Sequence, residues 1–152
     1  MAKFIFKMQS ILSIKEKLED QAKAEYGLEA AKLREEEKKL EVLIAKKEAY
    51  QERLKGAVQD TLDVREIKDL ENCVEHAKYT INVQKFVIKQ QQERVDRARE
   101  KLDTAMKEKK TYEKLKEKAF EQFKIEIEAQ ERKEIDELVS FRFRSAQKRE
   151  DY

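Results

Sequence analysis

The second half of the chain repeats apolar positions at a regular interval. From Ile67 onward, steps of three and four residues select Ile67, Leu70, Val74, Ala77, Ile81, Gln84, Ile88, Gln91, Val95, Ala98, Leu102 and Ala105. The first position of each heptad holds a branched aliphatic residue, and the fourth is mostly Ala or Gln. Such a repeat predicts a helix that supercoils in a left-handed sense against a partner helix.

The apolar positions of the first half are less regular. They are Ile11, Ile14, Leu18, Ala22, Tyr26, Ala30, Leu33, Leu40, Leu43, Tyr50 and Leu54. Steps of four residues from Leu18 to Ala30 depart from the heptad spacing. We therefore expect the supercoil to change locally in this stretch.

One break separates the two patterns, between Gly56 and Asp63. Gly56 can adopt the left-handed conformation that closes a helix. Asp63 can cap the next helix, with Glu66 as the reciprocal half of a capping box. Because the break spans only a few residues, the two helices are expected to fold back antiparallel.

These signals predict an all-α fold, a long antiparallel two-helix coiled-coil hairpin with a C-terminal helical overhang. Helix one is expected at about 4–56, the turn at about 57–62 and helix two at about 63–145. The whole chain, 1–152, is expected to form a single coiled-coil domain.

A turn near residue 60 sets the register, because the numbers of facing residues should then sum to about 120. Leu33 would face Ile88, for example. Residues beyond about 118 would lack an intrachain partner, yet an apolar stripe continues there: Phe120, Phe123, Ile127, Ile135, Leu138 and Phe141. Such a stripe indicates a binding surface, and a flexible or self-associating tail is the alternative.

Composition supports helices without a compact core. The 152 residues include 45% charged side chains, only two Gly and no Pro. Charges nearly cancel, with 35 Lys and Arg against 33 Asp and Glu. Because the signs are mixed almost everywhere, nucleic acid is not an expected partner. Only residues 142–149 are locally basic.

Several kinds of chemistry are excluded by residue counts. The two glycines lie too far apart for a phosphate-binding loop, and one His with one Cys cannot hold zinc. No catalytic cluster, cofactor or metal is expected. No apolar run approaches the length that spans a bilayer, so we expect a cytoplasmic protein without direct membrane insertion.

A few single residues leave alternatives open. Gln84 and Gln91 occupy seam positions, where they either mark the register or are simply tolerated. His76 is expected to be solvated and Cys73 to be a half-buried small hydrophobe. Gly27 would mark a bend or a close contact between helices.

Three stretches of the chain resemble the FliJ family of the bacterial flagellar type III export apparatus. The first is the opening, residues 3–12, where Phe4 and Phe6 precede a Lys/Glu-rich helix. The second is residues 40–44 followed by Tyr50 and Gly56, and the third is the charged stretch 131–137. Together they extend the resemblance over essentially the whole chain.

The resemblance implies an accessory stalk protein that is not an enzyme. It would bind the hexameric export ATPase FliI and the export-gate protein FlhA and handle export chaperones, at the cytoplasmic face of the cell membrane. The family's gate-binding surface corresponds here to Leu43, Tyr50, Leu70, Val74, Ala77 and Ile81. The ATPase contact is expected at Phe4, Phe6, Phe120, Phe123 and Ile127. A generic structural or tethering coiled coil is the alternative function.

Overall fold

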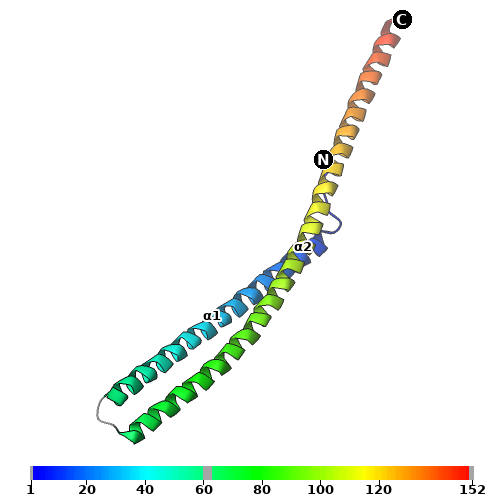
Figure 1. Cartoon of the computed structure of the whole chain (residues 1–152). Helices are drawn as coiled ribbons and strands as arrows, with labels where there is room; N and C mark the ends of the chain where they lie inside the picture. The colour runs from blue at the N-terminus through cyan, green and yellow to red at the C-terminus, as the bar shows by residue number, and fades with distance from the viewer. Residues whose placement is uncertain (1, 60–62, 151–152) are drawn as a thin grey trace. The chain divides into compact units, whose positions relative to one another are not determined.

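The computed structural model describes residues 2–59 and 63–150, and this part of the chain contains two α-helices and no strand. Helix α1 spans Gln9–Gln59 and α2 spans Val64–Glu150 (Figure 1). The chain is an all-α helical hairpin, which confirms the predicted fold class. The helices pack as two compact units, one of residues 19–105 and one of residues up to 18 with residues from 106 onward.

Helix α1 begins five residues later than predicted. Residues 2–8 are not helical, and the backbone N–H of Gln9 donates to the carbonyl of Phe6 at 3.1 Å to close the turn before the helix. The run Phe4, Ile5 and Phe6 consists of aromatic and β-branched residues, which lose side-chain freedom in a helix. This segment therefore does not join helix α1.

The predicted turn at 57–62 is only partly right. Helix α1 continues through Gly56 to Gln59, so residues 57–59 are helical, and residues 60–62 lie outside the described chain. Gly56 does not have a positive φ, so it does not close the helix. Ala57, the next residue, is half-buried and still helical.

The start of α2 follows the prediction closely. The Arg65 N–H donates to Asp63 Oδ1 at 3.1 Å, as expected of a capping aspartate. Within the described chain Glu66 does not complete a capping box, and it is exposed. The far end runs to Glu150 instead of 145, with the basic residues Lys148 and Arg149 in the last turn, where cations stabilise a helix C-terminus.

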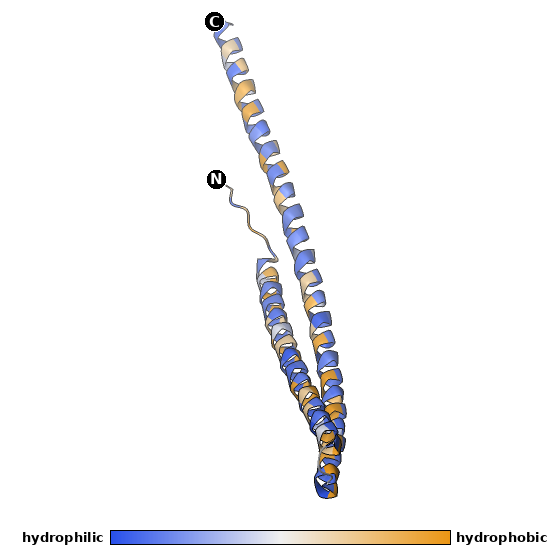
Figure 2. Cartoon of the chain, turned by 60° about the vertical axis from the view of Figure 1, so that its left-hand side comes forward, coloured by the Kyte–Doolittle hydropathy of each residue, from blue (hydrophilic) through white to orange (hydrophobic). Residues whose placement is uncertain are grey.

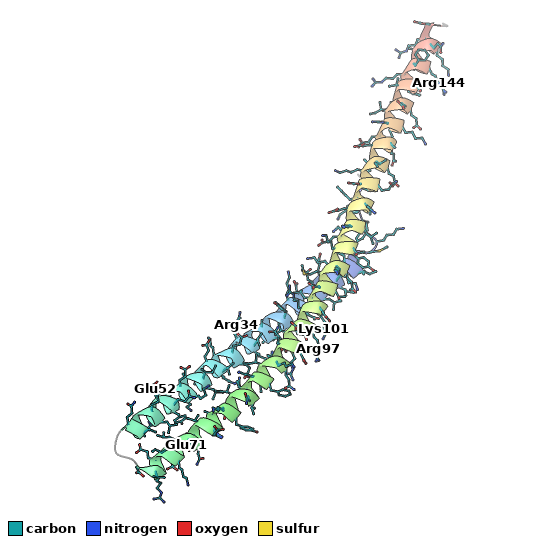
Figure 3. All side chains as sticks on the ribbon, viewed as in Figure 1. Arg34, Glu52, Glu71, Arg97, Lys101 and Arg144 are labelled. Carbon is teal, nitrogen blue, oxygen red and sulfur yellow. The ribbon has the colours of Figure 1, made fainter. Side chains whose placement is uncertain are left out.

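In the unit of residues 19–105, the two helices lie side by side and antiparallel (Figures 1 and 2). All twelve predicted seam residues of α2 are buried or half-buried. The predicted residues of α1 from Ala22 to Leu54 are also at least half-buried. Charged side chains such as Arg34, Glu52 and Arg97 project outward (Figure 3). The core is thus a single seam between the helices.

The first turns of α1 differ from the prediction. Ile11, Ile14 and Leu18 are exposed, whereas Leu12 is 2% exposed and Glu19 is 4% exposed. The expected interruption of the heptad is wrong, because positions at strict heptad spacing are all at least half-buried: 12, 15, 19, 22, 26, 29, 33, 36, 40, 43, 47, 50, 54 and 57. Several of these positions hold charged residues, and their aliphatic stems can pack in the seam.

In the other unit, the non-helical N-terminal segment covers part of α2. The ring of Phe4 packs edge-on against Phe120 at 5.2 Å between centroids and lies 5.3 Å from Phe123. Lys15 pairs with Glu108 at 2.9 Å. The expectation that residues beyond 118 lack an intrachain partner is therefore wrong as far as Phe123.

Candidate partner-binding surfaces

Two glutamines set the register in the unit of residues 19–105. Gln84 Nε2 donates to the backbone carbonyl of Glu36 at 2.9 Å and to its carboxylate at 2.6 Å. Gln91 Nε2 makes the same two bonds to Glu29, at 3.0 and 2.5 Å. The residue numbers of each pair, 84 with 36 and 91 with 29, sum to 120, so the predicted register is confirmed.

These bonds also decide between the two interpretations of Gln84 and Gln91. A tolerated polar residue would turn its amide to water, but each amide here binds the facing helix twice. The hydrogen bond from Gln84 is the main cause that holds the pKa of Glu36 below its ordinary value, with Lys39 adding to the effect. The pair is therefore charge-assisted and marks the register.

A groove lies between the helices near the hairpin turn. Its lining encloses about 370 Å³ and consists of Leu43, Lys46, Tyr50, Asn72, Cys73, His76, Ala77 and Thr80. Cys73 is half-buried and His76 is exposed, as expected. The Thr80 hydroxyl, which lines the groove, donates a hydrogen bond to the carbonyl of His76 in the same helix at 2.9 Å.

The six residues expected at the export gate separate into two groups. Leu43, Tyr50 and Ala77 line the groove. Leu70, Val74 and Ile81 do not line it and are buried in the seam. Tyr50 is half-buried, so its ring is within reach of a partner.

A second apolar site gathers around the N-terminal segment, in the other unit. Phe4, Phe120 and Phe123 form an aromatic cluster, and Lys124 Nζ lies 4.9 Å above the Phe120 ring. Hollows of about 560 and 410 Å³ flank the cluster, the second lined in part by Phe6. Four of the five residues expected to contact the ATPase are thus brought together, and Ile127 lies half-buried one turn beyond Phe123.

Sequence reasoning missed the packing of Phe4 on α2. The signal was present, because 4 with 120 and 4 with 123 sum to 124 and 127, close to the register of the hairpin. It also missed Leu12 and the Lys15–Glu108 ion pair, because the apolar pattern selects the exposed residues Ile11 and Ile14 beside them. A Cβ added to Gly27 would meet nothing within 4 Å, so the glycine does not mark a close contact between helices.

Among the described residues, no group of three or more His, Cys, Asp or Glu side chains is placed to hold a metal ion. No described helix is long and apolar enough to cross a membrane. The surface of the described residues includes the groove and the aromatic cluster, both of which suit the binding of another protein.

Comparison with known proteins identifies the family. A family model described as the flagellar FliJ protein matches residues 4–148. The chain belongs to the FliJ family. A flagellar FliJ protein of Bacillus subtilis (strain 168) is 29% identical to this FliJ-family chain over 134 residues, which cover 88% of the chain and 90% of that relative. No solved structure matches the chain.

Membership of the FliJ family confirms the resemblance found in the sequence. It gives the chain a role in flagellar protein export, and hence in motility, and the FliJ family is a non-catalytic component of the export machinery. The two-helix seam agrees with a coiled coil. The two surfaces described above are the candidate sites for that role.

Proposed function

We propose that this chain is the accessory stalk protein of flagellar protein export, which binds the export ATPase FliI and the gate protein FlhA and handles export chaperones. The observation that carries the proposal is the family match over residues 4–148, nearly the whole chain. In this role the protein acts at the cytoplasmic face of the cell membrane as a peripheral component. It transmits a mechanical or allosteric signal and performs no catalysis.

The groove near the hairpin turn is the proposed gate-binding surface. Leu43 and Tyr50 come from α1 and Ala77 from α2, so one partner segment could contact both helices at once. Tyrosine suits such a position because its apolar ring buries area while its hydroxyl finds a polar partner. The buried residues Leu70, Val74 and Ile81 would support the shape of the groove without direct contact.

The aromatic cluster is the proposed ATPase-binding surface. Phe120 remains 41% exposed even with Phe4 packed against it. Burying a large apolar side chain contributes roughly 1.5–3 kcal/mol. Phe6, Phe123 and Ile127 are half-buried at the same site, so a partner could add a substantial further area.

Co-purification of the full chain with its cognate FliI and with the cytoplasmic part of FlhA tests the proposal. For the gate, Tyr50→Ala should weaken FlhA binding while leaving the helicity intact. Tyr79→Ala is the matched control, because Tyr79 is exposed on α2 and does not line the groove. Equal losses in the two variants would remove the groove from the proposal.

For the ATPase, the double variant Phe120→Ala with Phe123→Ala should lose FliI binding and stimulation of ATP hydrolysis. Ile125→Ala changes an exposed apolar residue of the same helix and should retain both. If the wild-type chain copurifies with neither FliI nor FlhA, a tethering coiled coil within the export machinery becomes the better function.

A further inference from the structure

The last part of α2 exposes an apolar stripe that neither proposed site uses. Ile135, Leu138, Val139 and Phe143, at positions i, i+3, i+4 and i+8 of the helix, share one face and are 58–68% exposed. They fall within nine residues of one continuous helix, and Figure 2 shows apolar residues among hydrophilic ones along this stretch. No described residue outside the helix covers them, because residues 131–144 are all exposed.

Charge is distributed unevenly around this stripe. Residues 126–137 hold six acidic and two basic side chains, a net charge of −4. Residues 138–149 hold four basic side chains and no acidic one, a net charge of +4. We call these the acidic half and the basic half. Their boundary lies within the apolar stripe, between Glu137 and Leu138.

None of the four basic side chains in the basic half is in an ion pair within the described chain. Arg144, for example, projects from the helix into solvent (Figure 3). A helix of 24 residues is about 36 Å long, so the two halves extend about 18 Å each. Each half is too far from the other's distal end to be neutralised within its own helix at physiological salt.

We propose that residues 126–149 form a self-association surface on which a second copy of this chain packs antiparallel. In that arrangement the acidic half of one copy lies along the basic half of the other, twice over. The apolar stripes meet at the centre, around Val139. The contact uses the same patch on both copies, as a two-fold interface requires.

The charge pattern selects this partner and this direction. Parallel packing would place acidic half against acidic half and basic half against basic half, so repulsion disfavours it. An anionic lipid surface would attract the basic half but repel the acidic half directly beside it. Only a partner with the inverse charge order matches both halves, and a reversed copy of the same helix has that order.

Sedimentation equilibrium of the full chain, from low to high micromolar concentration, tests the proposal. We expect a monomer–dimer equilibrium that weakens as salt is raised, because the flanking charges are exposed. Val139→Asp places a charge at the centre of the contact and should abolish the dimer. Ser140→Asp, on the polar side of the same turn, is the matched control and should retain it.

A charge exchange tests the direction. One variant carries Arg142→Glu and Arg144→Glu, and the other carries Glu134→Arg and Asp136→Arg. Each alone should dimerise about tenfold or more weakly than the wild type, because attraction between the halves is lost. An equimolar mixture should recover association as a heterodimer, since the altered residues then face one another with opposite charges.

A wild-type chain that stays monomeric over the whole concentration range would overturn the proposal. A dimer that Val139→Asp does not disturb would show that the copies meet elsewhere. Failure of the mixture to associate, with a normal helical signal by circular dichroism in both variants, would overturn the antiparallel arrangement. None of these outcomes depends on whether FliI or FlhA binds.

Discussion

Gln91 binds Glu29 through two acceptors at once, donating from Nε2 to the backbone carbonyl at 3.0 Å and to the carboxylate at 2.5 Å. Gln84 and Glu36 repeat this geometry one heptad away on both helices. A shift of one helix by a single turn would break both pairs and leave four donor–acceptor contacts unmade. The two pairs therefore stabilise the observed register together, because any shift of the helices loses both at once.

The first prediction concerns Gln91 itself. Gln91→Glu removes both donors and sets a carboxylate against Glu29, so the free energy of unfolding should fall by about 1–3 kcal/mol. Urea denaturation followed by circular dichroism measures the change. Gln90→Glu makes the same substitution at an exposed position and should stay near the wild type. Equal losses would assign the effect to net charge alone.

The second prediction concerns the alignment of the helices. In a chain with Cys73 replaced by Ser, cysteines at Leu33 and Ile88 should form an intrachain disulfide, because these positions lie between the two Gln–Glu pairs. Non-reducing electrophoresis detects the bond as a change in mobility. Cysteines at Leu33 and Ile81 are one heptad out of register, about 10 Å along the helix, and should not crosslink.

The third prediction concerns the loss of thermal stability at low pH. The hydrogen bond from Gln84 lowers the pKa of Glu36 below 4.5, so the folded state favours the ionised carboxylate. Its contribution is complete above pH 4.5 and is lost as the pH falls through the lowered pKa. Melting temperatures measured from about pH 5 to about pH 3 should therefore fall less steeply for Glu36→Gln than for the wild type. Glu37→Gln, at an exposed position, should keep the wild-type profile.

The fourth prediction concerns the N-terminal segment. Phe4→Ala removes two aromatic contacts, each worth about 0.5–1.5 kcal/mol beyond the buried area. Residues 2–8 should then detach more often, and trypsin should cleave after Lys7 faster. Ile5 is exposed in the same segment, so Ile5→Ala should leave the cleavage rate unchanged. Faster cleavage in both variants would show that Phe4 does not fix the segment.

The seam of α2 could be predicted because apolar residues occupy nearly every heptad position. The seam of α1 could not be followed in the same way. Lys15, Glu19 and Glu29 occupy seam positions there. A pattern based on apolar residues therefore misses them and selects exposed neighbours such as Ile14. A charged residue can face the seam only where a residue of the other helix pairs with it or forms a hydrogen bond to it. The sequence of one helix alone does not identify that residue.

The candidate sites were predictable in location and less so in composition. Heptad spacing places Leu43 and Tyr50 on the facing side of α1, but Asn72 and Thr80 join the groove only once the register is known. Phe4 lies in a segment without helical periodicity, so no repeat indicates its contact with Phe120. Local pattern therefore predicts the helices better than it predicts what packs against their ends.

Among the described residues no large side chain is fully buried, since the seam is one layer deep. Much of the apolar surface is already hydrated in the folded state, so unfolding exposes less new apolar surface per residue than it does in a compact domain. The heat-capacity change of unfolding should be correspondingly small, because it scales with newly exposed apolar area. Stability should then vary only weakly with temperature, with a broad maximum and little tendency to cold denaturation.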